Sequence, residues 1–167
     1  MLHSPSGVLV VVPCGKSKIW KHEPERGSVP AAEAYTGEMF RRNRRYAEQF
    51  GYAWIVLSAK YGFIAPNFLI PGSYEVTFKD RSTHPIEISA LRDQVRSQDL
   101  SQYAVVVGLG GKEYRAAIEE AFAGTPARII FPFAGLPLGR LLRATQQATN
   151  SGDPGFAMEQ DDHEYSR

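Results

Sequence analysis

The chain has 167 residues, 43% of them hydrophobic and 22% charged, with a formal net charge of +1. This size and composition predict one soluble domain that buries roughly two-thirds of its unfolded surface. With no apolar run near the ~20 residues that span a bilayer, no secretory signal at the start and a single cysteine, we expect no membrane partner, no internal disulfide and a reducing, cytoplasmic location.

Apolar runs and helical patterns alternate along the chain. Runs rich in Val and Ile without strict alternation are typical of strands covered on both faces. Helical spacing followed by a glycine or polar stop predicts helices, the first with Thr36 as N-cap. In chain order, the pattern predicts a strand at 8–12, a helix at 37–50, a strand at 53–57, a helix at 86–95, a strand at 103–107, a helix at 112–123, a strand at 127–131 and a helix at 136–148.

Strands that alternate with helices predict a mostly parallel sheet. Right-handed crossovers place helices on both of its faces. We therefore predict a three-layer α/β/α sandwich with about four core strands. The segment 63–80, which contains Pro66, Pro71 and Gly72, is expected to be an extended excursion or hairpin over the sheet edge, a kind of loop that is usually functional or mobile.

Two compact, basic segments follow predicted strands: Pro13-Cys14-Gly15-Lys16-Ser17-Lys18 and Leu57-Ser58-Ala59-Lys60-Tyr61-Gly62. The carboxyl ends of neighbouring parallel strands open into one crevice, where ligands of open α/β sheets bind. Lysines beside exposed backbone N–H groups are typical of phosphate sites, although the spacing is not that of a Walker A loop. We therefore expect an anionic or nucleotide-like ligand bound by residues of both segments, namely Gly15, Lys16, Ser17, Lys60, Tyr61 and Gly62.

Cys14 is either a nucleophile or a small buried hydrophobe. The positive charges of Lys16 and Lys18 would favour its thiolate. A lone cysteine is more often simply buried, and spacing does not show whether a histidine folds beside it. No CxxC or HExxH spacing occurs, so we predict no metal site, and nothing indicates a cofactor.

Further candidates lie elsewhere in the chain. The turn at Gly110 and Gly111 either presents N–H donors to an anion or only permits a tight turn, since the dinucleotide fingerprint is incomplete. Aromatic rings could stack on a base or belong to the core. The remaining ligand candidates are Tyr35, Thr36, Tyr74 and Tyr114, and the carboxylates that could act as a general base are Glu75, Asp80 and Glu113.

Arginines cluster on the first predicted helix. Arg41, Arg42 and Arg45 either contact a nucleic-acid backbone or form a solvated helix face. Charge is distributed unevenly along the chain. Residues 151–167 hold five acids and one base, which leaves a net charge of +5 on residues 1–150. We assign 1–150 to one α/β domain and 151–167 to an acidic tail, which is either a disordered end or a shield for a basic cleft.

Three segments together resemble a family of bacterial and phage domains of unknown function. They are Cys14-Gly15-Lys16-Ser17-Lys18, then Ala34-Tyr35-Thr36-Gly37-Glu38-Met39-Phe40, and Leu57-Ser58-Ala59-Lys60-Tyr61-Gly62 with Pro66; the family patterns are roughly CGKxK, YTSxxF and LSAKYGLLxP. The resemblance covers roughly residues 8–145. It includes Gly110-Gly111-Lys112-Glu113-Tyr114 and the segment from Pro132 to Gly139.

Two more distant resemblances concern single segments. The segment from Leu57 to Gly62 resembles the LSGLYGxLxPxD stretch of the YaaA peroxide-stress proteins, which are associated with DNA binding and iron homeostasis. Pro13, Cys14 and Lys18 match the PCxxxK start of the lysine-transferring domain of archaeosine synthase, which acts on a deazaguanine base in tRNA. The serine–histidine end of that motif is absent here. These resemblances imply a pocket for a nucleobase, nucleotide or nucleic acid.

The sequence leaves three hypotheses open. The first is an enzyme acting on a nucleobase, a nucleotide or a base within nucleic acid, in which Cys14 or Lys18 reacts, Ser58 orients the substrate and Glu75 stabilises developing positive charge. The second is a non-enzymatic DNA- or RNA-binding protein of the YaaA type. The third is a small-molecule sensor or toxin-associated partner. The sequence does not indicate the oligomeric state.

Overall fold

The computed structural model describes residues 6–157, and its centre is a five-stranded sheet. The strand order is β4-β3-β1-β6-β7, and all neighbours are parallel except the edge pair β3–β4. The strands are β1 (Val8–Pro13), β3 (Ala53–Ser58), β4 (Gly62–Ile64), β6 (Val105–Gly108) and β7 (Arg128–Ile130). The four predicted strands are all present, and they form the parallel part of the sheet.

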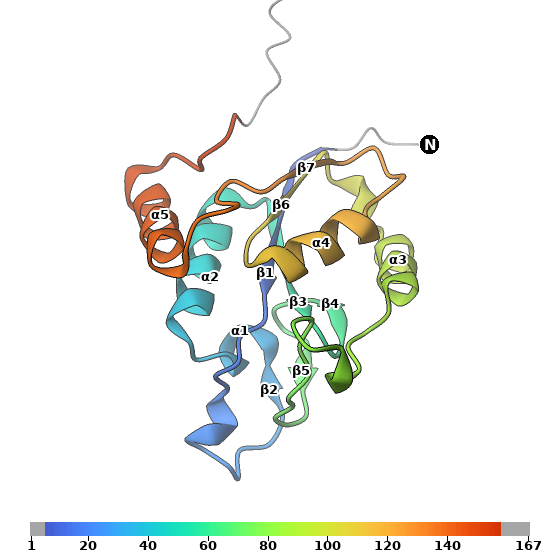
Figure 1. Ribbon diagram of the computed structural model, residues 1–167, viewed down its shortest axis with the longest axis vertical. Helices are drawn as coiled ribbons and strands as arrows, with labels where there is room; N and C mark the ends of the chain where they lie inside the picture. Colours follow the sequence, from blue (N-terminus) through green and yellow to red (C-terminus); the bar gives the residue numbers. More distant parts are fainter. Residues whose placement is uncertain (1–5, 158–167) are drawn as a thin grey trace, which may run out of the picture.

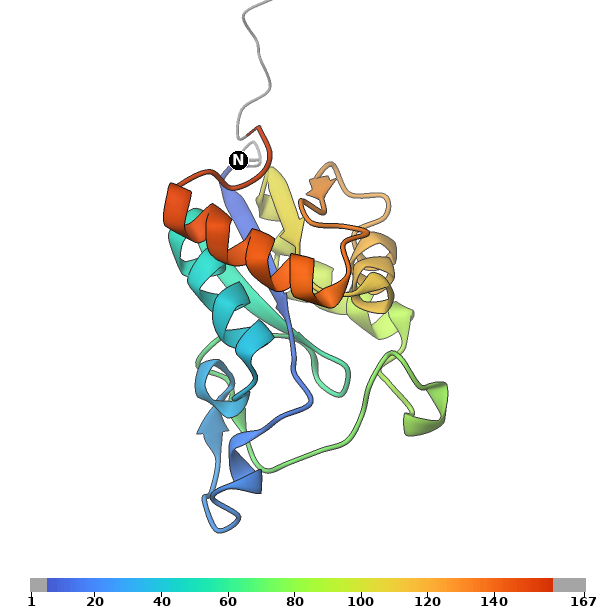
Figure 2. The same ribbon diagram turned by 60° about the vertical axis from the view of Figure 1, so that its left-hand side comes forward.

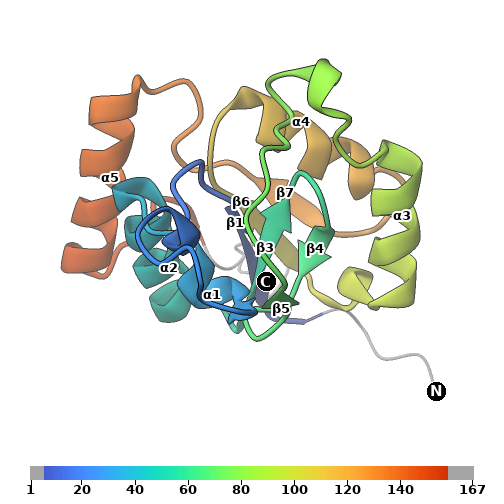
Figure 3. The same cartoon turned by 90° about the horizontal axis from the view of Figure 1, so that it is seen from below.

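Helices lie on both sides of this sheet (Figure 1). Helices α2 (Glu38–Phe50) and α5 (Leu138–Ser151) lie side by side on one side, and α3 (Ile88–Ser97) and α4 (Lys112–Ala121) pack together on the other. Figure 3 shows the same three layers from below. The predicted α/β/α sandwich is therefore confirmed.

Strand β1 holds the two halves of the core together. Its side chains alternate, with Val8, Val10 and Val12 in the cluster beneath α2 and α5, and Leu9 and Val11 in the cluster beneath α3 and α4. None of the five is more than 7% exposed. A strand covered on both faces needs apolar residues at every position, which is why the run shows no polar alternation.

Several short elements complete the fold. A two-stranded antiparallel ribbon pairs β2 (Val29–Pro30) with β5 (Leu69–Ile70) and lies beyond the edge of the main sheet, next to α1 (Ala31–Ala34). Three 3₁₀ turns are η1 (Ile19–Lys21), η2 (Arg81–Thr83) and η3 (Leu100–Gln102).

The predicted N-cap of α2 is wrong. Gly37, rather than Thr36, is the N-cap residue, and no side chain caps the helix. The backbone N–H of Thr36 instead donates to the carbonyl of Ser17 at 3.0 Å, which ties Thr36 to the segment after β1. A tertiary contact has therefore displaced the local capping preference by one residue.

The first residues of the predicted acidic tail lie against the domain. Tyr46 donates its hydroxyl proton to the carbonyl of Pro154 at 2.6 Å, and Phe156 packs on the core. The rest of that tail, 158–167, lies outside the described residues. Within residues 6–157, none of the helices is both long enough and apolar enough to cross a bilayer.

Candidate ligand-binding site

The two basic segments leave the sheet at the same edge. Strands β1 and β3 are adjacent and parallel, with Pro13 opposite Leu57, and the Cys14 N–H donates to the Leu57 carbonyl at 3.0 Å. The segment 14–18 and the segment that starts at Ser58 therefore leave the sheet next to each other. This is the arrangement predicted from the carboxyl ends of neighbouring strands.

Backbone contacts fold the segment after β1 back toward the sheet. Lys18 forms an isolated antiparallel bridge with Tyr35, next to the hydrogen bond from Thr36 to Ser17. These contacts turn the Lys18 side chain inward, so that this residue is only 7% exposed. Charged side chains are rarely this buried without a partner or a function.

The excursion between β5 and α3 forms the opposite wall. The segment after β1 and the segment after β5 face each other in Figure 2. Between them is a cavity of about 940 Å³. We call this cavity the lysine cleft, and its lining residues are Cys14, Gly15, Lys16, Ser17, Lys18, Trp20, Lys21, Ser73, Tyr74, Glu75, Val76, Thr77, Lys79 and Tyr114.

A chain of buried hydroxyl groups supports the Tyr74 wall. Ser58 Oγ accepts hydrogen bonds from the backbone N–H groups of Lys60 and Tyr61, so its own proton is free for Tyr74 Oη, 2.8 Å away. Tyr74 Oη is also hydrogen-bonded to Tyr35 Oη at 2.5 Å. Burial raises the pKa of both tyrosines, which keeps their hydroxyl groups neutral. The network therefore fixes the Tyr74 ring at the cleft wall.

Lys18 lies on the face of that ring. Its Nζ is 4.4 Å from the centre of Tyr74 and donates a hydrogen bond to the Lys16 carbonyl at 3.3 Å. Burial lowers the pKa of Lys18 below its usual value, and the charges of Cys14 and Glu75 oppose this shift. An amine in such surroundings is neutral, and hence nucleophilic, in a larger fraction of molecules than an exposed lysine.

Cys14 also lines the cleft. It is half-buried, and its Sγ is 3.5 Å from the hydroxyl oxygen of Tyr114 in α4. The ring of Tyr114 stacks edge-to-face with Phe78 at 5.1 Å between centres. Cys14 is therefore both packed and open to the cleft, so the structure keeps both sequence interpretations of this residue possible.

The cleft has a basic lining. Besides Lys18, the exposed lysines Lys16, Lys21 and Lys79 line it, and Glu75 is its one acid among the described residues. All ion pairs recorded within residues 6–157 use arginine, so none of these lysines is neutralised by one. Such a lining attracts anions such as phosphate groups.

Other predicted ligand residues lie behind the cleft wall. Ser58 and Tyr35 are buried and do not line the cleft; Ser58 contacts its Tyr74 wall, and Tyr35 contacts both Tyr74 and Lys18. Tyr61 contacts the Tyr74 ring edge-to-face, and Lys60 Nζ is 5.8 Å from the centre of the same ring. Ser58 thus positions Tyr74 rather than lining the cleft.

The glycines have backbone roles. Gly62 has φ +77° in the tight turn between β3 and β4, and a Cβ there would overlap the Gln94 side chain. Gly110 has φ +100°, and a Cβ would come within 2.6 Å of Pro13. These conformations favour glycine. Neither residue lines the lysine cleft, nor does Gly111 or Thr36.

The arginines of α2 are divided between two roles. Arg42 pairs with Glu38 and donates to the Leu142 carbonyl, which ties α2 to α5. Arg41 and Arg45 are exposed. Of the three predicted nucleic-acid contacts, these two are exposed, whereas Arg42 is half-buried and already bound to Glu38 and Leu142.

Sequence reasoning missed part of the cleft. Trp20, Lys21, Ser73, Val76, Thr77 and Lys79 line it but were not candidates. Trp20 was recognisable only as an aromatic residue near the basic segment. Its indole N–H donates to the carbonyls of Arg26 and Gly27, which fixes the ring at the cleft wall.

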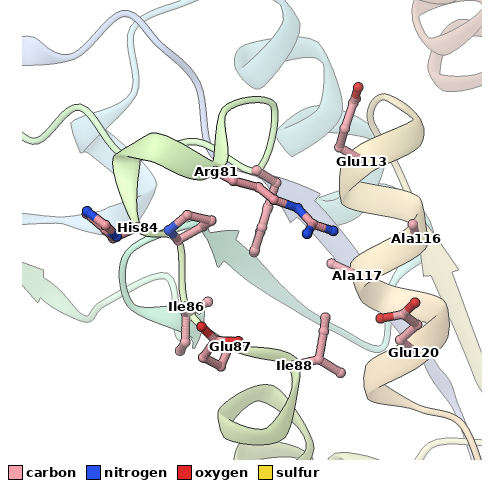
Figure 4. Close-up of a pocket in the computed structure, with 11 residues that line it drawn as sticks. Arg81, His84, Ile86, Glu87, Ile88, Glu113, Ala116, Ala117 and Glu120 are labelled. Carbon is pink, nitrogen blue, oxygen red and sulfur yellow. The ribbon is translucent and has the colours of Figure 1, made fainter.

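A second cavity, of about 650 Å³, lies between α4 and the segment 78–88 (Figure 4). Arg81 reaches toward α4, and Phe78 and Ala117 contribute apolar surface. The charged residues that line it besides Arg81 are His84, Glu87, Glu113 and Glu120. Within the described part of the chain, no group of three or more His, Cys, Asp or Glu side chains could hold a metal ion.

Comparisons with known proteins place this sandwich in a family. The model of a family of unknown function, DUF6884, matches residues 9–147, and the chain belongs to that family. A curated Bacillus subtilis (strain 168) relative, the uncharacterized protein YfjM, is 36% identical over 141 residues, covering 84% of this chain and 93% of the relative.

Among solved structures, AF0587, a protein of unknown function, matches 95% of this chain with a TM-score of 0.44 and 13% identity. The match covers 48% of AF0587, so this chain spans about half the length of that protein.

Proposed function

We propose that the lysine cleft is the active site of an enzyme that acts on a nucleobase, a nucleotide or a base within nucleic acid, by glycosidic-bond or base-modification chemistry. The observation that carries this proposal is the inward-turned Lys18. It is buried against Tyr74 yet lines a cavity of about 940 Å³. A buried amine with a perturbed pKa in a cleft is a typical mark of a functional site.

The lining supports a ligand that has both phosphate and a flat ring. Lys16, Lys21 and Lys79 are exposed and available to phosphate oxygens. Trp20 and Tyr74 add aromatic surface to the walls, which suits apolar contact with a base. The volume of the cleft lies in the range of about 300–1,000 Å³ that is usual for small-ligand sites.

The residues divide into roles in this proposal. Cys14 or Lys18 is the reacting group, Glu75 stabilises positive charge that develops on the substrate, and Ser58 acts through Tyr74. The resemblances of single segments to the YaaA proteins and to the archaeosine synthase domain point to the same class of ligand. A reducing, cytoplasmic location belongs to the proposal, since Cys14 is the single cysteine.

The test is a search for altered or released bases. The purified protein is incubated with nucleosides, nucleotides and oligonucleotides, and the products are analysed by mass spectrometry. We expect one of these classes to change, and the change to be lost in the double variant Cys14→Ala, Lys18→Ala. Activity that is unaffected in that variant would refute the assigned roles.

A non-enzymatic DNA- or RNA-binding protein is the second candidate, and it rests on the exposed Arg41 and Arg45. Binding through these side chains would fall steeply as salt is added. The double variant Arg41→Glu, Arg45→Glu should then lose affinity for DNA or RNA in a titration. Unchanged affinity would exclude this helix face as the contact surface.

A further inference from the structure

Two nucleophiles share the lysine cleft, and their surroundings differ. Cys14 Sγ has the Tyr114 hydroxyl as its neighbour, at 3.5 Å. Of the histidines within the described residues, His84 lines the second cavity and His22 lines neither cavity, so none lines the cleft. Cys14 therefore lacks the basic partner that activates the cysteine of a Cys–His pair.

Lys18 needs no such partner. Its residue is 7% exposed and its Nζ is held between the Tyr74 ring and the Lys16 carbonyl. Desolvation disfavours the ammonium form, so burial increases the fraction of molecules in which this amine has a free lone pair. The carbonyl hydrogen bond also restricts where Nζ can lie, which positions it for attack on a bound ligand.

We propose that Lys18 Nζ forms a covalent bond to C1 of a phosphorylated pentose, which gives an imine intermediate in glycosidic-bond cleavage. This inference rests on the proposed function and names its nucleophile and its electrophile. The exposed Lys16, Lys21 and Lys79 would hold the phosphate, and Glu75 lies on the same lining to offset positive charge at C1.

The amine lone pair attacks C1 while the bond from C1 to the base nitrogen breaks. That bonding pair leaves with the base, which takes up a proton released by the amine. The remaining N–H proton moves to the ring oxygen as the C1–O bond opens, which leaves a C1=N imine on Lys18. Water then hydrolyses the imine to the free aldehyde and restores the amine.

Borohydride trapping tests this chemistry on the full chain. Two probes supply the same aldehyde carbon: an oligonucleotide with an abasic position, and free ribose or deoxyribose 5-phosphate. Sodium borohydride reduces an imine to a stable amine, which adds the mass of the probe less one oxygen atom. We expect this adduct on the proteolytic peptide that contains Lys18, and the more reactive probe identifies whether the pentose belongs to a nucleic acid or is free.

Peptide mapping of the unaltered protein locates the adduct without requiring any variant to fold. Each unit by which the pKa of a lysine is lower raises its neutral fraction at pH 7 about tenfold, so Lys18 should exceed the exposed lysines in yield. Lys18→Met should abolish the adduct. Lys112→Met, which alters an exposed lysine that lines neither cavity, should retain it.

The outcomes separate this inference from the function on which it rests. Released or altered bases without a Lys18 adduct would overturn the imine and leave the enzyme proposal standing. An adduct on Lys18 without any altered base would support the amine chemistry and count against a natural N-glycoside substrate. Labelling spread over the exposed lysines, or on Cys14, would overturn the inference.

Discussion

The lysine cleft, lined by Tyr114, and the second cavity, lined by Phe78, meet where these two rings pack edge-to-face, yet their charged side chains differ in burial. In the cleft, Lys18 and Tyr74 are 7% and 6% exposed. In the second cavity, Glu113 is half-buried. The other lining residues of this kind are exposed, namely Arg81, His84, Glu87 and Glu120. The cleft buries one of its charged side chains, Lys18, whereas the second cavity buries none of its own.

Burial of a charged group without a charged partner opposes folding, whereas an apolar residue of the same size would not. Among residues 6–157, Lys18 forms no ion pair, and its direct polar contact is a backbone carbonyl. The reacting role that we propose for Lys18 would account for a residue that opposes folding, since functional sites commonly hold such groups. The exposed charges of the second cavity need no such explanation.

The largest expected effect tests this difference between the cavities directly. Lys18→Met should lower the rate of base alteration by about 10²–10⁴-fold, the usual contribution of a reacting acid–base or nucleophilic side chain. Arg81→Met removes a cation of similar length from the second cavity and should leave the rate unchanged. Both rates are measured by mass spectrometry of the released or altered bases. Equal losses in the two variants would break the comparison.

The fold was predictable because its signals are local. The β1 and β6 runs are apolar at every position, and the glycine after Phe50 marks the end of α2. Strand β4 was missed because it has three residues and follows β3 through a tight turn at Gly62. The β2–β5 ribbon was missed because each of its strands has two residues.

The site was predictable in part. Cys14, Lys18 and Ser58 follow adjacent parallel strands, so their proximity follows from topology. Trp20 and Thr77 line the cleft because of the path that two irregular segments take, and no periodic sequence pattern specifies such a path. The burial of Lys18 depends on its backbone bridge to Tyr35, a contact between segments that local sequence does not reveal.

A second prediction concerns Gly62, which belongs to the second basic segment but lines neither cavity. Gly62→Ala should destabilise the fold by about 2–4 kcal/mol, because φ +77° strains alanine and its Cβ would displace Gln94 from Tyr61 and Phe63. Gly139→Ala, at an open helical position, should be neutral or slightly stabilising. Urea unfolding of both variants provides the measurement; a stable Gly62→Ala protein with lost ligand binding would instead assign Gly62 to the site.

A third prediction concerns the wall behind Lys18. Tyr74→Phe leaves the buried hydroxyls of Ser58 and Tyr35 without their shared partner, and should cost about 1–3 kcal/mol of unfolding free energy. Tyr52→Phe is the matched control, since Tyr52 is 83% exposed and should change stability little. Both free energies come from urea titration. Similar values for the two variants would show that the hydroxyl chain does not support the cleft.

The smallest expected effect is a pH dependence that only the cleft should show. Because burial lowers the pKa of Lys18 in the folded protein, the unfolded chain binds this proton more tightly. The stability contribution of Lys18 should therefore rise with pH between that lowered pKa and the ordinary value of 10.5, and be constant below this window. Because a buried charge opposes folding, Lys18→Met should have the higher unfolding free energy at neutral pH. This difference from the protein that retains Lys18 should shrink across the same pH interval.

This measurement is made in a Cys14→Ser background, so that the neighbouring thiol does not contribute to the difference. Urea unfolding at a series of pH values gives the free-energy difference between Lys18→Met and its parent, and Lys112→Met is the control because Lys112 is exposed. The control difference should stay flat with pH. A flat difference for Lys18→Met as well would mean that the cleft solvates its lysine as fully as the second cavity solvates Arg81, and the contrast between the two cavities would disappear.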